Sequence, residues 1–416
     1  MSSKRLATNN NQLPEGYKKT DIGVIPEDWE YQAIGEAFEI RNNLRLPISK
    51  EKRQYIQGKY PYYGPTNVQD YIDEYRVEGE HALIGEDGDH FLKWRDLSMT
   101  LLVDGKFNVN NHAHIIKGVK NLTAWFYYFF AHRDLTQYLK RQGAGRYKLD
   151  KNTLINIPCA IPPLREQKAI AQTLSDVDAL IAALDKHIAK KRNIKTGTMQ
   201  QLLTGKTRLP GLGGSWKTML FLEIAWCRKE RIDPRKSGTQ EFCVELEHIE
   251  SGTGRLLGNT QTGDQSSLKA VFQPGDVLFG KLRSYLQKYW IADREGVCST
   301  EIWVLAANAR LVISKFLYQV VTTEQFINAA SNAYGTHMPR SDWNIVKNYK
   351  VAVPPLPEQK AIAKVLFDID TEITALEKRR AKTQAIKQGM MQELLTGRTR
   401  LKIEHPDDPI TKNSNG

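Results

Sequence analysis

Residues 162–171 read Pro-Pro-Leu-Arg-Glu-Gln-Lys-Ala-Ile-Ala, and residues 354–363 read Pro-Pro-Leu-Pro-Glu-Gln-Lys-Ala-Ile-Ala. The same shift of 192 positions relates Leu-Leu-Thr-Gly-Lys-Thr-Arg-Leu at 202–209 to Leu-Leu-Thr-Gly-Arg-Thr-Arg-Leu at 394–401. From 161 to 209 the two copies align without a gap, and roughly 30 of the 49 positions are identical, so the unit is far longer than a solenoid repeat. This duplication predicts one molecule with internal two-fold symmetry and two different working surfaces.

Each copy of the repeat carries the signals of one long helix. Proline cannot lie inside a helix, so the Pro-Pro pair that opens each copy marks a helix start. Gly205 and Gly397 stand where the helices should end. We therefore expect helices near 166–203 and 358–395, each roughly 57 Å long at about 1.5 Å per residue.

Apolar residues within each copy recur at alternating spacings of four and three, which is typical of the a/d seam of a coiled coil. The expected seam consists of Ile170, Leu174, Val177, Ile181 and Leu184 in the first copy and Ile362, Leu366, Ile369, Ile373 and Leu376 in the second. It loosens where Ile188 corresponds to Arg380, and we expect it to resume at Ile194 and Ile386. The two helices should therefore pack antiparallel as a coiled coil.

The segments that precede the repeats are rich in β-branched and aromatic residues interrupted by Gly and Asn, which predicts compact domains of mixed strands and helices. The fold class is therefore α+β, with two globular domains separated by two long helices in a pseudo-two-fold arrangement. Similarity between the domains is visible at their edges, and their interiors do not align convincingly. The expected boundaries are an N-terminal segment at 1–24, a first domain at 25–158, a first helical spacer at 159–210, a second domain at 211–351, a second helical spacer at 352–402 and a polar tail at 403–416.

The overall charge limits the class of partner. A net charge of +12 and a pI near 9.3 favour an anionic partner such as DNA, RNA or a membrane surface. The first residues lack an apolar signal core, and the longest helical apolar run, at 180–184, is far too short to span a bilayer. The four cysteines lack the spacing of a zinc site or a disulfide framework, so a reducing cytoplasm is the expected location.

Three motifs resemble catalytic or metal sites without completing one. Thr-Gly-Lys-Thr at 204–207 lacks the first glycine of a phosphate-binding loop and ends a helix. His112 and His114 have no third metal ligand at a suitable spacing, so a structural histidine pair is expected instead. Asp87 and Asp89 lack a downstream Glu-x-Lys partner for nuclease chemistry and are either a polar turn or a DNA contact. Because no methyl-donor loop is found either, we expect no catalytic residue, metal or cofactor in this chain.

Loops that mix cations with aromatic residues and glycine are the candidate DNA-binding sites. Arginine forms paired hydrogen bonds with guanine, lysine neutralises phosphate, and tyrosine can bond to a base edge. The alternative for each residue is a solvated surface loop. The candidates are Lys106, Arg141, Arg146, Tyr147, Lys148, Lys281, Arg283, Tyr285, His337 and Arg340. The loops at 143–148 and 335–340 occupy the same place relative to the two repeats.

The repeated helix start and its Leu-Leu-Thr-Gly ending strongly resemble the specificity (S) subunit of type I restriction-modification enzymes, over nearly the whole chain. Segments 16–29, 61–64 and 245–252 resemble, less specifically, parts of the target-recognition domains of that family. The resemblance implies that each domain reads half of a split, asymmetric DNA site. It also implies a non-catalytic scaffold for methylation (M) subunits, expected to number two, and for motor-nuclease (R) subunits. Adenine methylation and ATP-dependent cleavage, with methyl donor, ATP and magnesium, would then belong to those partners.

Two other functions stay open on the sequence. One is a DNA-recognition module of another restriction-modification system, type II-like with a separate catalytic part. The other is a structural coiled-coil adaptor, which accounts for the helices but not for the positive charge or the two large dissimilar domains. An autonomous nuclease or methyltransferase is disfavoured because its motifs are missing.

Overall fold

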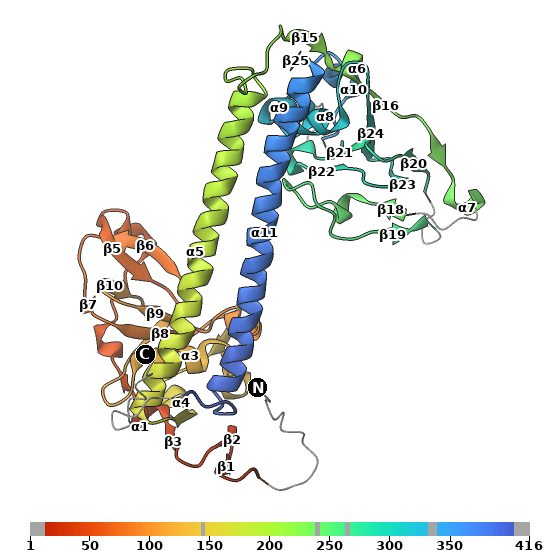
Figure 1. Cartoon of the computed structure of the whole chain (residues 1–416). Helices are drawn as coiled ribbons and strands as arrows, with labels where there is room; N and C mark the ends of the chain where they lie inside the picture. The colour runs from red at the N-terminus through yellow and green to blue at the C-terminus, as the bar shows by residue number, and fades with distance from the viewer. Residues whose placement is uncertain (1–12, 143–145, 238–241, 263–266, 332–338, 403–416) are drawn as a thin grey trace, which may run out of the picture. The chain divides into compact units, whose positions relative to one another are not determined.

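The computed structural model describes residues 13–142, 146–237, 242–262, 267–331 and 339–402. The chain divides into two compact units: unit 1 contains Met1–Ala183 and Arg380–Gly416, and unit 2 contains Leu184–Arg379. The two long helices are α5 (Leu164–Leu202) and α11 (Leu356–Leu394), and each contributes one half to each unit. Both lie close to the ranges that the repeats predict, so this prediction is confirmed (Figure 1).

Unit 1 contains one globular domain besides its halves of the long helices. Its strands are β1 (Tyr17–Thr20), β2 (Gly23–Pro26), β3 (Glu30–Ala33), β4 (Glu39–Ile40), β5 (Gln57–Tyr63), β6 (Val68–Ile72), β7 (Val77–Glu78), β8 (His81–Gly85), β9 (Thr100–Val103), β10 (Lys106–Val109), β11 (Ala113–Lys117), β12 (Lys140–Gln142), β13 (Arg146–Lys148) and β14 (Pro158–Ile161). Its short helices are α1 (Ile34–Ala37), α2 (Lys50–Arg53), α3 (Thr123–Ala131) and α4 (Lys151–Ile155).

Unit 2 contains the second globular domain. Its strands are β15 (Lys217–Leu220), β16 (Ala225–Cys227), β17 (Arg231–Ile232), β18 (Phe242–Val244), β19 (Thr260–Gln261), β20 (Lys269–Phe272), β21 (Val277–Gly280), β22 (Tyr289–Ile291), β23 (Gly296–Ser299), β24 (Ile302–Ala307) and β25 (Lys350–Val353). Its short helices are α6 (Phe221–Ile224), α7 (Pro234–Ser237), α8 (Ser314–Val321), α9 (Glu324–Ser331) and α10 (Trp343–Val346).

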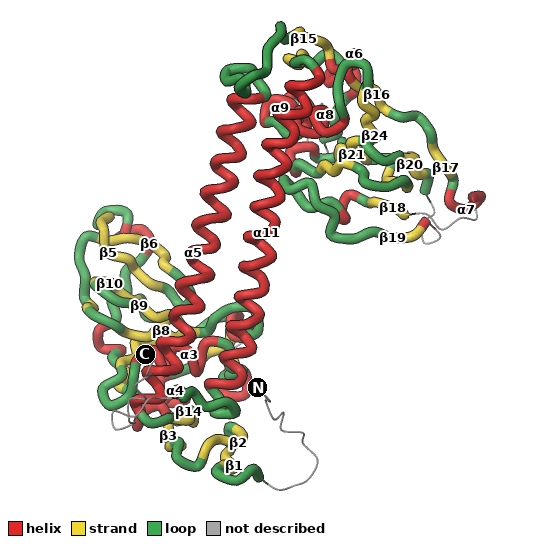
Figure 2. The backbone as a smooth tube through the Cα atoms, viewed as in Figure 1, coloured by secondary structure: helices red, strands yellow, loops and turns green. Residues whose placement is uncertain are grey.

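The main sheets of the two domains share one topology. Figure 2 shows the strands of each domain in yellow. An antiparallel sheet has the order β4-β11-β8-β9 in unit 1 and β16-β24-β21-β22 in unit 2. The second sheet has the order β6-β5-β10-β7 in unit 1 and β19-β18-β23-β20, followed by β17, in unit 2. In both, the second and third strands are parallel. The duplication, which the sequence reveals only in the repeats and at the domain edges, therefore extends through both domains.

A two-stranded antiparallel ribbon connects each domain to its long helix. In unit 1, β3 pairs with β14; in unit 2, β15 pairs with β25. The Pro-Pro pair follows β14 and β25 directly and leads into α5 and α11. The chain therefore enters and leaves each domain through one ribbon, and the domain interiors are residues 34–157 and 221–349.

The apolar cores include the first turns of the long helices. In unit 1, Trp29 and the aromatic residues of α3 pack in one cluster with Ile170, Leu174 and Met391. In unit 2, Phe221 and Phe316 pack in one cluster with residues of α11 and with Leu202. The start of one helix and the end of the other thus meet in the core of each unit, which burial of apolar surface stabilises.

The predicted seam is buried only in part. Ile170, Leu174, Leu184, Ile362, Leu366 and Ile373 are buried, whereas Val177, Ile181, Ile369 and Leu376 are partly exposed. Ile194 and Ile386 are 42% and 48% exposed, so the expectation that the seam resumes there is wrong. Ion pairs between the two helices take over in this stretch.

These ion pairs give the helix direction within each unit. In unit 2, Lys195 Nζ lies 2.7 Å from Asp370 Oδ1, and Arg192 Nη2 lies 2.7 Å from Glu377 Oε1. Residue numbers rise along α5 as they fall along α11, so the paired halves run antiparallel, as predicted. In unit 1, Lys387 and Asp178 form the corresponding pair, shifted by 192 at both partners. Within the described residues, no helix has an apolar stretch long enough to cross a bilayer.

Candidate functional site

The repeated glutamate lies at the junction between domain and helices. In unit 1, the buried Glu166 carboxylate accepts hydrogen bonds from Trp29 Nε1 at 3.0 Å and from Arg400 Nε and Nη2 at 2.6 and 2.7 Å. Arg400 also pairs with Asp28 at 2.8 Å, and this contact holds the pKa of the Asp28 carboxyl below its usual range. One carboxylate thus links the domain, the start of α5 and the segment after α11.

The same junction is formed in unit 2 from the other ends of the two repeats. Glu358 accepts from Trp216 Nε1 at 3.0 Å and from Arg208 Nη2 at 2.7 Å. Arg208 closes the first repeat and pairs with the start of the second, whereas Arg400 closes the second repeat and pairs with the start of the first. The reciprocal pairs explain why glutamate and arginine recur at a shift of 192.

The repeated glutamine positions a helix of each domain. Gln167 Oε1 accepts from the backbone N–H of Leu122, the residue before α3, at 2.8 Å. Gln359 Oε1 accepts from the N–H of Ile313, the residue before α8, at 3.0 Å. Both side chains are buried and satisfy a helix N-terminal donor that would otherwise be unpaired. In the sequence these glutamines are recognisable only as part of the repeated family signature. Their identity in both copies is the one sequence signal for a shared structural role.

The predicted DNA-binding residues of the first domain gather mainly on one hairpin. Strands β12 and β13 place Arg141 opposite Tyr147, and the Arg141 guanidinium lies 5.1 Å from the centre of that ring. The Arg146 side chain is exposed. Residues 143–145 lie outside the described part of the chain. Lys106 is on β10 instead, beside Glu78 and 4.5 Å from the ring centre of Tyr75, so the structure does not group it with the hairpin.

The hairpin contacts the turn that follows β8. Gly88 N–H donates to the carbonyl of Tyr147 at 3.0 Å, and Leu149 N–H donates to the carbonyl of Glu86 at 2.7 Å. The Glu86 carboxylate pairs with Lys148 at 3.4 Å and with Arg45. The turn that contains Asp87, which the sequence predicts to be either a polar turn or a DNA contact, therefore lies against the hairpin that carries most of the predicted DNA-binding residues of the first domain.

Two histidines near this turn have different environments. His112 Nδ1 lies 2.8 Å from Asp87 Oδ2, and its side chain is 43% exposed. His114 is fully buried, with Nε2 2.7 Å from the Leu149 carbonyl and Nδ1 2.8 Å from Asn42 Nδ2. Burial lowers the pKa of His114. Both nitrogens of His114 are thus used structurally, and no group of three or more His, Cys, Asp or Glu among the described residues is arranged to hold a metal ion.

In the second domain the structure brings two predicted loops together. Arg283 N–H donates to the carbonyl of Pro339 at 2.8 Å, and Ser341 N–H donates to the carbonyl of Lys281 at 2.8 Å. Arg340 Nε donates to Glu301 Oε2 at 3.0 Å. Arg283 and Tyr285 are exposed, whereas Lys281 is partly exposed. His337 lies outside the described residues. Arg340 therefore shares one surface with Lys281 and Arg283, although it is distant from them in the sequence.

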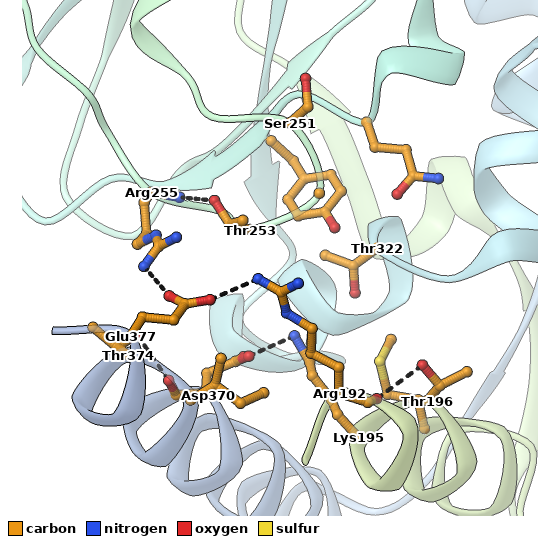
Figure 3. Close-up of a pocket in the computed structure, with 15 residues that line it drawn as sticks. Arg192, Lys195, Thr196, Ser251, Thr253, Arg255, Thr322, Asp370, Thr374 and Glu377 are labelled. Atoms are coloured by element: carbon orange, nitrogen blue, oxygen red, sulfur yellow. Dashed lines mark hydrogen bonds and ion pairs between the residues drawn. The ribbon is translucent and has the colours of Figure 1, made fainter. Parts of the chain in front are cut away.

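A polar cavity of about 400 Å³ in unit 2 lies between the second domain and the helices. Figure 3 shows Glu377 of α11 between Arg192 of α5 and Arg255 of the domain. Nearby, Asp370 faces Lys195, and burial raises the pKa of the Asp370 carboxyl. The acidic and basic side chains that line this cavity pair with one another. Their ion pairs connect the second domain to the two helices and leave no unpaired charge for a ligand among these five residues.

Comparisons with known proteins agree with this architecture. The family model for the type I restriction modification DNA specificity domain matches residues 26–192 and 253–388, which is more than half of the chain. The type I restriction enzyme MjaVIII specificity subunit of Methanocaldococcus jannaschii is 24% identical over 93% of this chain and 97% of its own length. A putative type I restriction enzyme specificity subunit of Haemophilus influenzae is 37% identical over 36% of this chain and 38% of its own length.

A solved structure shows the same fold. The S subunit of a type I restriction-modification system from M. genitalium superposes with a TM-score of 0.58, over 94% of this chain and 98% of that one, at 16% identity. The family-model match over more than half of the chain leads to one conclusion. The chain belongs to the type I restriction-modification DNA specificity family.

Proposed function

We propose that this chain reads a bipartite, asymmetric DNA target for a type I restriction-modification complex, with one half of the target assigned to each domain. The observation that carries the proposal is that two domains of one topology present different side chains at matching places. Two similar frames favour two similar docking geometries, and different loop residues favour different bases. The target is therefore not a palindrome.

The proposed target-recognition domains are residues 25–158 and 211–351, with helical spacers at 159–210 and 352–402. Lys106, Arg141, Arg146, Tyr147 and Lys148 contact the first half-site. Lys281, Arg283, Tyr285, His337 and Arg340 contact the second half-site. The net charge of +12 supports this assignment, because phosphate contacts supply most non-specific affinity.

The second part of the proposal concerns partners. The paired helices form a scaffold on which two methylation subunits dock, and motor-nuclease subunits join that assembly. The reciprocal Glu166–Arg400 and Glu358–Arg208 pairs support equivalent docking places in the two units. The chain itself contributes no catalytic residue. Methyl donor, ATP and magnesium bind the partner subunits, which carry out adenine methylation and ATP-dependent cleavage.

A competition binding assay tests the recognition role. The isolated chain should bind target and non-target duplexes with similar, salt-sensitive affinity, and addition of the matching methylation subunit should make binding selective. Equal selectivity with and without that subunit would contradict the division of labour. A complex that never prefers any duplex would favour the structural adaptor instead.

A mutation tests the assignment of domains to half-sites. Arg146→Ala should change recognition in the first half-site only, with a loss of about 1–3 kcal/mol if the arginine binds guanine. Sequencing of methylated adenines in DNA from a host that carries the variant complex would show it. A change in both half-sites, or none, would place Arg146 outside the base-reading surface.

A further inference from the structure

The turn after β8 and the turn after β21 are equivalent, although their sequences differ. β8 and β21 hold the same position in sheets of the same order. Three backbone hydrogen bonds are reproduced around the turns, and their distances agree within a few tenths of an ångström. The donor and acceptor pairs are Glu86 to His112, Gly88 to Tyr147 and Leu149 to Glu86 in unit 1, and Lys281 to Glu301, Arg283 to Pro339 and Ser341 to Lys281 in unit 2.

These bonds align three of four positions directly, and the bridges Asp87–Lys148 and Leu282–Arg340 align the fourth; the side chains differ in all four. Glu86 corresponds to Lys281, Gly88 to Arg283, His112 to Glu301 and Lys148 to Arg340. The last pair also obeys the shift of 192 that the helical repeats define independently. The alignment therefore does not depend on the turns alone.

At the second of these positions the backbone has a positive φ in both domains, yet only the first domain has glycine there. Gly88 has a φ of 131°, and Arg283 has a φ of 52°. Positive φ is unfavourable for residues with a Cβ atom and is commonly stored at functional sites. Arg283 is exposed and is one of two non-glycine residues with positive φ in the described part of the chain. The second domain thus presents a guanidinium where the first has no side chain.

The charge of the two surfaces also differs. Around Glu86, acids and bases balance, because Glu86 faces Arg45 and Lys148, and Asp87 faces His112. Around Lys281, the cations outnumber the acids. Arg340 pairs with Glu301, whereas Lys281 and Arg283 have no acidic partner among the described residues.

We infer that these four equivalent positions are the base-selecting surface of each domain, an inference that rests on the proposed function. Arg283 selects a guanine in the second half-site, because its guanidinium fits the O6 and N7 acceptors of guanine. In the first half-site the selecting group is His112. His112 Nδ1 lies within hydrogen-bond distance of the Asp87 carboxylate. In the tautomer in which Nδ1 carries the hydrogen and donates it to Asp87, the Nε2 lone pair accepts a hydrogen bond from the amino group of adenine or cytosine.

The test uses the full-length chain in complex with its methylation subunit, and the readout is the set of methylated adenines in host DNA. Arg283→Ala should relax one G·C position of the second half-site, with a loss of discrimination of about 10- to 100-fold. His112→Ala should relax one position of the first half-site only. Arg310→Ala, an exposed arginine of the second domain, and His132→Ala, a partly exposed histidine of the first domain, are the matched controls and should leave the target unchanged.

Arg283→Lys guards against a folding defect, because it keeps the charge and the backbone strain but loses the paired hydrogen bonds. It should relax the same G·C position while the chain still co-purifies with the methylation subunit. The inference is overturned if folded Arg283 variants keep the wild-type target, if they relax the first half-site, or if they weaken methylation of all sites equally. Failure of the wild-type complex to methylate any bipartite target would instead overturn the proposed function.

Discussion

Arg283 combines an unfavourable backbone conformation with an exposed side chain. A residue with a Cβ atom loses about 1–2 kcal/mol in the left-handed region, and glycine there avoids the loss but costs about 0.5–1 kcal/mol of chain entropy. Arg283→Gly should therefore be about 1 kcal/mol more stable than Arg283→Ala, as measured by urea unfolding of the two variants. Equal stability, or a more stable alanine variant, would mean that the backbone at 283 is not strained.

Individual contact residues are the part that the sequence predicts least. Composition marks Lys281, Arg283 and Arg340 as candidates, but their common surface depends on hydrogen bonds between segments about 60 residues apart. The sequence suggests His112 only as a metal ligand or, preferably, as one of a structural histidine pair, because nothing in the local sequence shows that Asp87 faces it. Long-range pairing of this kind leaves no periodic signal.

At the scale of elements, the ends of α5 and α11 depend on one buried carboxylate each. Glu166→Ala would remove the acceptor of the buried Trp29 Nε1–H and one partner of Arg400. An unpaired buried donor costs about 1–3 kcal/mol, so the unfolding free energy should fall by about 2–3 kcal/mol. The control is Arg165→Ala, the exposed neighbour whose counterpart in the second repeat is proline. A loss below about 0.5 kcal/mol in Glu166→Ala would contradict the proposed junction.

Helix α4 offers a pH-dependent test. Asp150 accepts from Thr153 N–H at 2.8 Å and pairs with Lys140 at 2.8 Å. The hydrogen bond from Lys140, followed by that from Thr153, lowers the pKa of Asp150 to about 2. Because the folded pKa lies below the unfolded value of about 3.9, the stabilisation is complete above about pH 4 and is lost as pH falls toward about 2.

Asp150→Asn retains a good helix cap and removes this titration. Wild-type stability should therefore fall more steeply than that of the variant between about pH 4 and pH 2, measured by denaturant unfolding at each pH. Parallel pH profiles for the two proteins would show that Asp150 does not carry the effect.

The sequence predicts the long helices well because proline, glycine and the repeat act locally. It predicts the sheets poorly, since the strands are short and their partners lie far along the chain. The failed seam at Ile194 and Ile386 has a similar cause: apolar spacing alone does not reveal that ion pairs such as Lys195–Asp370 connect the helices there.

At the scale of the whole molecule, duplication gives two domains of one topology, each inserted through a ribbon into the same helical frame. The fold and the family could be inferred from the two repeats, because segments that share many residues at a constant shift of 192 positions adopt the same structure. The difference between the two surfaces could not, because it depends on turns that align only in three dimensions. We propose that each domain independently specifies one half of the target.

A chimera tests this claim most directly. Residues 221–349 are replaced by a second copy of residues 34–157, so that β15 and β25 are kept and the junctions fall at equivalent places. Methylated adenines are then mapped in DNA from a host that carries the chimera and the methylation subunit. We predict a palindromic target, in which the first half-site appears twice in inverted orientation across the wild-type gap. A target that still contains the second half-site would show that residues 34–157 do not specify a half-site independently of their position in the chain.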